Sequence, residues 1–112
     1  MTITNTAKNR IRDLIADDIS TGALGTGTTS PSSTDTDLEA KETATEKSVT
    51  VTTGEQQLNV KYILSTTEGN GKDYTEFGVY FSNGDLLSRL VFPVFSKTEN
   101  VELHIAHTIN IL

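Results

Sequence analysis

The stretch VELHIAHTINI, residues 101–111, places an apolar residue or a histidine at every second position. Successive side chains of a β-strand point to opposite faces of the sheet, so this period of two predicts a strand with one buried face. His104 and His107 are an odd number of residues apart, so they fall on opposite faces and cannot chelate one metal ion within the chain. We expect His107 to pack in the sheet and His104 to face solvent.

The same period of two runs through the sequence that precedes this strand. Its inward rows are Val49 and Val51; Leu58, Val60, Tyr62 and Leu64; and Phe77, Val79 and Phe81. Asn83-Gly84 is a strong hairpin signal, and it predicts a return strand over residues 86–92. Pro93 cannot donate to a sheet ladder, so we expect it to close that strand. Residues 48–112 are therefore predicted to form an antiparallel meander or sandwich of about five to six strands.

A different period, 3.6 residues, governs residues 5–17 and predicts an amphipathic helix. Its apolar stripe contains Ala7, Ile11, Leu14 and Ile15. Thr4, Asn5 and Thr6 are all candidate N-caps. Such a helix is only about 20 Å long at 1.5 Å per residue, too short to be stable alone, so the stripe is expected to dock on the rest of the chain. A short apolar segment, residues 19–24, follows and can enter the sheet.

Residues 25–47 lose all periodicity and are dominated by Gly, Ser, Thr and Asp, which is typical of a long surface loop. Leu38 is the one apolar anchor near its end. Together these segments predict an α+β fold in one domain, residues 1–112, with a short N-terminal helix packed on a mainly antiparallel sheet and a long Gly/Ser/Thr-rich loop.

Composition narrows the partners that the chain can have. It has 112 residues, 15 acidic against 9 basic side chains, a net charge of −6 and no cysteine. The basic residues form no stripe, so nucleic acid and anionic membranes are unfavourable partners. No apolar run approaches the roughly 20 residues that span a bilayer, and the N-terminus lacks the pattern of a signal peptide. We expect a soluble protein that is cytoplasmic when synthesised.

No catalytic or cofactor motif is complete. The glycines of residues 25–27 lack the Lys-Ser/Thr of a phosphate loop, and Asp35, Asp37 and Glu39 begin like a calcium loop that has Ala40 where glycine is needed. Incidental calcium binding in the loop stays open. The three acids around one turn, Glu68, Asp73 and Glu76, have no apolar pocket and are expected to be solvated charges. We predict no catalytic residue, no metal site and no cofactor, hence no enzyme.

Aromatic residues supply the candidate partner-binding surface. In the strand register, Tyr74, Glu76, Gly78 and Tyr80 face away from the inward row of Phe77. Tyr62 and Tyr80 can belong to a second, interface-forming face, and Leu38 lies on the adjoining loop. We therefore take Tyr62, Tyr80 and Leu38 as the candidate partner-binding residues.

Several short segments resemble small tail-associated structural proteins of tailed phages and proviruses. They are ALGTGTTSP at 23–31, DTDLE at 35–39, TEFGVY at 75–80, LLSR at 86–89, Phe92-Pro93 and SKT at 96–98. The resemblance covers nearly the whole chain and implies a non-enzymatic virion component at a tail, baseplate or fibre-attachment position. It further implies proviral origin, homo-oligomeric assembly with copies of itself or other virion proteins, and location in the virion. His104 and His107 depart from the aromatic or acidic pattern of such proteins, so interface details are not expected to transfer.

An alternative function also fits the residues alone. A free-standing β-rich binding module for a glycan or a protein partner could use Tyr62, Tyr80 and the turn at residues 69–71. Assembly predicts self-association, whereas a binding module predicts a monomer with a saturable site.

Overall fold

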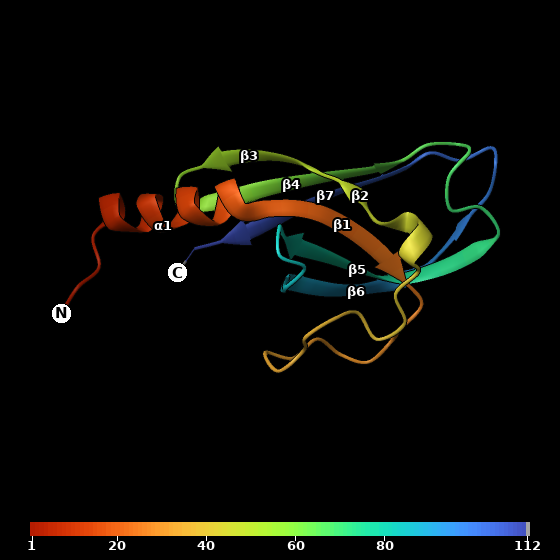
Figure 1. The fold of residues 1–112 in the computed structure, drawn as a ribbon, viewed down its shortest axis with the longest axis horizontal. Coiled ribbons are helices and arrows are strands. Elements are labelled where there is room, and N and C mark those ends of the chain that lie inside the picture. The colour runs from red at the N-terminus through yellow and green to blue at the C-terminus, as the bar shows by residue number, and fades with distance from the viewer. Residues whose placement is uncertain (112) are drawn as a thin grey trace.

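The computed structural model describes residues 1–111 and consists of two stacked antiparallel sheets, with the N-terminal helix at one end (Figure 1). The elements are α1 (Asn5–Asp18), β1 (Ile19–Gly25), the 3₁₀ helix η1 (Thr43–Thr45), β2 (Lys47–Ser48), β3 (Thr50–Gly54), β4 (Gln57–Leu64), β5 (Lys72–Phe81), β6 (Leu86–Lys97) and β7 (Leu103–Asn110). One sheet has the order β2-β1-β5-β6 and the other the order β3-β4-β7. The predicted α+β class is confirmed, with seven strands in place of five to six.

The hydrophobic core lies between the two sheets. It is formed by Leu24, Val60, Tyr62, Leu64, Tyr74, Phe77, Val79 and Leu103. Tyr62 and Phe77 come from different sheets, and their rings meet edge to face with centroids 5.2 Å apart. The period of two thus placed the main apolar rows of β4, β5 and β7 on the correct faces.

Tyr74 lies on the other face from the predicted one. The register between β5 and β6 is irregular at this point, because β5 advances two residues from Tyr74 to Glu76 while β6 advances four from Phe95 to Val91. An irregularity of this kind disturbs the regular alternation of faces along a strand. Tyr74 lies with Phe77 in the core, while Glu76 faces the loop on the opposite side. Such an irregularity cannot be read from periodicity, because it interrupts the period on which the prediction rests.

Pro93 does not end its strand, so the predicted boundary at Phe92 was wrong. Strand β6 continues through Pro93 to Lys97. Because β6 is the outermost strand of its sheet, a residue without an N–H breaks no ladder on its free side. Proline on an edge strand also discourages pairing with a further strand.

Helix α1 begins where expected but docks differently. The Thr4 hydroxyl accepts a hydrogen bond from the Ala7 N–H at 3.2 Å, which identifies Thr4 as the N-cap. No residue of α1 is fully buried: Ala7, Ile11 and Ile15 of the predicted stripe are half-buried, whereas Leu14 is 72% exposed, so the stripe packs only in part. Polar contacts add to the docking, since Arg12 Nη1 donates to the Gly54 carbonyl at 2.6 Å. The helix leans on the end of the β3–β4 hairpin and projects beyond the sheets (Figure 1).

Candidate assembly surfaces

Glu76 is fully buried, contrary to the expectation of a solvated charge. Its carboxylate accepts four hydrogen bonds, from Gly27 N at 2.8 Å, Glu39 N at 3.0 Å, Ala40 N at 2.8 Å and Arg89 Nε at 2.8 Å. The first three donors are backbone N–H groups from both ends of the loop at residues 26–40. One carboxylate on β5 therefore holds the long loop against the outer face of its sheet.

The electrostatics of this cluster favour the ion pair. Burial opposes ionisation of Glu76, but the hydrogen bonds from Arg89 and from the loop N–H groups outweigh it, so the pKa of Glu76 lies below its usual value. The bond to Glu76 likewise raises the pKa of Arg89. The Arg89 side chain is 3% exposed and also lies 3.3 Å from Asp35. Its Nη2 atom is buried and has no hydrogen-bond partner within residues 1–111.

Leu38 supplies the apolar part of the loop's attachment. It is 6% exposed and packs with Ala23, Tyr80 and Leu86 on the outer face of the sheet. Gly78 permits this approach, because a Cβ at that position would lie 2.7 Å from Leu38 Cδ2. Asp37 accepts a hydrogen bond from the Tyr80 hydroxyl beside this contact. The loop is therefore a packed layer over β5.

The three residues predicted to bind a partner are covered by the chain itself. Tyr62 is 0%, Tyr80 2% and Leu38 6% exposed. Tyr62 belongs to the core and donates its hydroxyl to the Thr45 carbonyl, while Tyr80 and Leu38 lie beneath or within the loop. As folded, these side chains offer no surface to a partner, so a partner contact has to be sought elsewhere.

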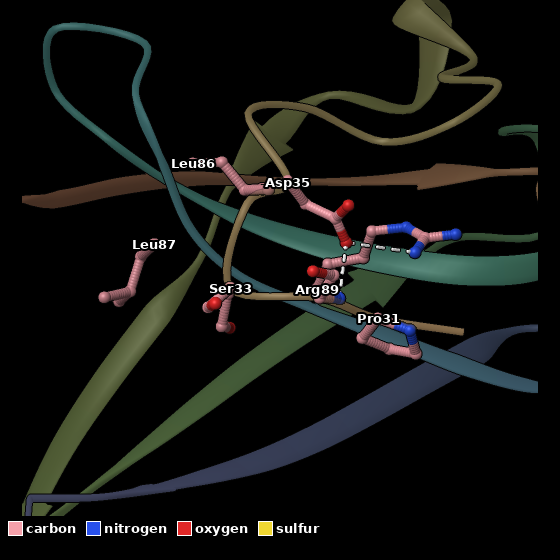
Figure 2. A pocket seen from close by; sticks show the side chains of 8 residues that line it. Pro31, Ser33, Asp35, Leu86, Leu87 and Arg89 are labelled. Atoms are coloured by element: carbon pink, nitrogen blue, oxygen red, sulfur yellow. Dashed lines mark hydrogen bonds and ion pairs between the residues drawn. The ribbon is translucent and has the colours of Figure 1, made fainter. Parts of the chain in front are cut away.

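A hollow of about 320 Å³ lies between the loop and the start of β6 (Figure 2). Its lining consists of Pro31, Ser32, Ser33, Asp35, Leu86, Leu87, Ser88 and Arg89. Figure 2 shows the Asp35 carboxylate turned toward Arg89, and Asp35 also accepts from Ser32 N at 2.9 Å. The Asp35 and Arg89 charges of the hollow are thus engaged with each other. Of the lining serines, Ser88 has its hydroxyl 3.3 Å from the His107 ring nitrogen.

The two histidines lie on opposite faces of β7, as predicted. His104 is exposed and contacts Glu102, whereas His107 is half-buried, lies 3.3 Å from the Ser88 hydroxyl and meets Phe77 edge to face. Burial lowers the pKa of His107. Within residues 1–111 no three acidic or histidine side chains gather in a way that could hold a metal ion. Nor does that part of the chain contain a helix with the length and apolarity to cross a membrane.

An open seam separates β6 from β7. They are the outermost strands of their two sheets, and no backbone hydrogen bond joins them within residues 1–111. Between them lies a groove of about 400 Å³, lined by Leu90, Phe92, Pro93, Phe95, Leu103, His104, Ile105 and Ala106. On the opposite side the chain passes directly from one sheet to the other, because Val49 alone separates β2 from β3.

The seam, the exposed face of α1 and the edges of the sheets are the surfaces that this chain leaves available. No signal in a single sequence could have indicated the seam, since it results from how two sheets stack. No family model, curated protein or solved structure matches the chain.

Proposed function

We propose that this chain is a non-enzymatic structural component of a virion, of proviral origin where a cellular genome carries it, that acts by protein–protein assembly. It associates with copies of itself and with other virion proteins. The observation that carries the assembly function is the open apolar seam between β6 and β7. The tail, baseplate or fibre-attachment position rests on the sequence resemblance.

The seam exposes apolar side chains whose burial in an assembly would be energetically favourable. Leu90, Phe92 and Phe95 on β6 face Leu103 and Ile105 on β7, and most of these side chains are only partly buried. Burial of apolar surface is worth roughly 25 cal/mol per Å². Contiguous apolar grooves between unpaired strands are the surfaces through which proteins associate.

The charged groups support a structural rather than a chemical role. Glu76, the buried carboxylate, has its oxygens engaged by four donors that position the loop. A catalytic acid or base has to face a substrate, and Glu76 faces only its own chain. The alternative of a glycan-binding module is less supported, because Tyr62 and Tyr80 provide no exposed aromatic platform.

Sedimentation velocity of the full chain from micromolar to millimolar concentration tests the proposal. The wild type is expected to associate, and Ala106→Lys, at the exposed rim of the seam, is expected to remain monomeric. Thr52→Lys is the matched control, because Thr52 is exposed on β3 at the far edge of the same sheet. A wild-type chain that stays monomeric throughout overturns the proposal.

A further inference from the structure

We infer that the exposed edge of β7 is a strand-addition site and that its occupant is β7 of a second copy, paired antiparallel across a two-fold axis. This inference deepens the proposed assembly function and rests on it. It identifies the partner by the chemistry of the edge: unpaired backbone N–H and C=O groups flanked by apolar and uncharged side chains. Such groups bind most strongly to another extended backbone.

Two of the four sheet edges, β2 and β6, carry features that hinder strand addition, and a third, β3, is covered at its Gly54 end. Strand β2 has only two residues, and α1 lies against the end of β3, where Arg12 already occupies the Gly54 carbonyl. Strand β6 contains Pro93 and two register shifts against β5. Short edges, covered edges, prolines and bulges are the devices by which natural sheets avoid pairing with further strands.

Strand β7 lacks every one of those devices. It has eight residues, Leu103–Asn110, which pair with β4 in an unbroken register. It contains no proline and no Asp, Glu, Lys or Arg, although 21% of the chain is charged. An edge of this kind is the one at which a sheet is expected to extend.

The lack of charge also favours a second copy as the occupant. Beside a two-fold axis a residue lies close to its own counterpart, so a charge there would meet a like charge when the strand paired with itself. Strand β7 has no Asp, Glu, Lys or Arg, so it incurs no such repulsion between these side chains. A second β7 would also lie along the groove beside Leu90 and Phe92, and would cover apolar surface that a monomer leaves exposed.

The alternation of β7 restricts the register of such a dimer. Directly opposite residues of an antiparallel pair point to the same face, so the axis has to pass through a residue for the apolar rows to meet. We place it at Ala106, a small residue on the exposed face. Ile105 then lies opposite His107 of the second copy, and Leu103 opposite Ile109.

Charge complementation at Ala106 tests this arrangement directly. Ala106→Lys and Ala106→Glu each place two like charges across the axis, so each variant alone is expected to sediment as a monomer where the wild type is a dimer. Mixed in equal amounts, they are expected to form the dimer, because opposite charges then face one another. Thr52→Lys and Thr52→Glu, on the outward face of β3, serve as controls that dimerise both alone and mixed.

Cysteine cross-linking provides an independent readout, because the chain has no cysteine of its own. Under oxidation Ala106→Cys is expected to form a covalent dimer at a concentration where Thr52→Cys does not. The wild type can associate while the mixed Lys and Glu variants fail to dimerise and position 106 fails to cross-link. In that case this inference is wrong, and the proposed assembly function holds through a different contact. If the wild type does not associate, both fail.

Discussion

Arg89 Nε lies 2.8 Å from Glu76 Oε1, and their side chains are 3% and 0% exposed. This ion pair joins neighbouring strands of one sheet, and the same carboxylate reaches Gly27, 49 positions away in the chain. A loop as long and polar as residues 26–40 is usually mobile. Here it is held by the buried Glu76 carboxylate, by the packing of Leu38 and by further hydrogen bonds, such as that from the Tyr80 hydroxyl to Asp37.

Removal of that charge should destabilise the whole domain. Glu76→Gln leaves the buried Arg89 guanidinium with only the more distant Asp35, at 3.3 Å, as a counter-charge. Breaking a buried pair costs about 3–5 kcal/mol in the free energy of unfolding. Denaturant unfolding monitored by circular dichroism measures the loss. Glu99→Gln, an exposed position, is the control and should lie within about 0.5 kcal/mol of the wild type. A Glu76→Gln variant as stable as this control would contradict the assigned role.

The same site should make stability depend on acid pH. Although burial opposes ionisation, the bonds from Arg89 and the loop hold the pKa of Glu76 below its usual value. Below the unfolded-state value of about 4.3, the unfolded chain therefore binds more protons than the folded one. Stabilisation by Glu76 is complete above that pH and is lost as the pH falls through the folded pKa.

Unfolding curves measured from pH 6 to pH 2 should separate the wild type from Glu76→Gln. The wild type is expected to lose stability more steeply in acid, and the two curves should converge at low pH. Hydrogen bonds from Lys47 and Ser65 lower the pKa of Glu68 to about 2. Its contribution to the pH dependence is the same in both proteins and cancels in the difference between the two curves. Parallel curves would show that Glu76 is not preferentially ionised in the folded state.

The close contact between Gly78 and Leu38 predicts a non-additive pair of substitutions. Gly78→Ala places a Cβ 2.7 Å from Leu38 Cδ2, and overpacking of this kind costs about 1–3 kcal/mol. Leu38→Ala removes the opposing side chain and should cost about 2–5 kcal/mol by itself. In the double variant the Gly78→Ala change should cost much less than it does alone. Thermal unfolding of all four proteins decides the matter, and strictly additive changes would exclude the contact.

The register of β7 can be tested with two single substitutions to aspartate, one on each face of the strand. Leu103→Asp puts an unpaired charge in the core and should unfold the domain, whereas Ala106→Asp lies on the exposed face and should fold as a monomer. Far-ultraviolet circular dichroism and a melting curve at low concentration distinguish the two. Cooperative, wild-type-like melting of Leu103→Asp would overturn the register.

The docking of α1 should depend more on Arg12 than on Leu14, the exposed member of its apolar stripe. Arg12→Ala removes the hydrogen bond to the Gly54 carbonyl and should lower the free energy of unfolding by about 1–2 kcal/mol. Leu14→Ala, at a side chain that is 72% exposed, should change it by less than about 0.5 kcal/mol. Hydrogen exchange of the helix amides reports the same difference locally, and a larger effect of Leu14→Ala than of Arg12→Ala would contradict this assignment.

Much of the fold could be predicted because local pattern and local structure coincide. The Thr4 cap precedes the first helical turn, and Asn83-Gly84 forms the turn between β5 and β6, with Gly84 at a positive φ of 93°. The alternation of β4 and β7 buried the expected rows. Capping and turn conformations are set by neighbouring residues, so they can be read from a few positions.

Other features were missed because they depend on partners distant in the chain. The proximity of Glu76 to Gly27 and Ala40 is created by the loop folding back over β5. Pro93 was predicted to end its strand because proline is tolerated inside a strand only at the edge of a sheet, and the edge position of β6 is known only from the tertiary structure. The aromatic candidates Tyr62 and Tyr80 were placed correctly in their strands, but what covers each of them was decided by the opposite sheet and by the loop.

The amino-acid sequence by itself determined the secondary structure, the faces of the main strands and the long polar loop, since propensity and periodicity act between residues close in the chain. Only the tertiary structure decided that a carboxylate is buried under that loop, that the helix docks with part of its apolar stripe exposed, and that two strand edges enclose an open apolar groove. These features arise where segments far apart in the chain pack together and remove each other's surface from water. Such long-range contacts leave no periodic pattern along the sequence.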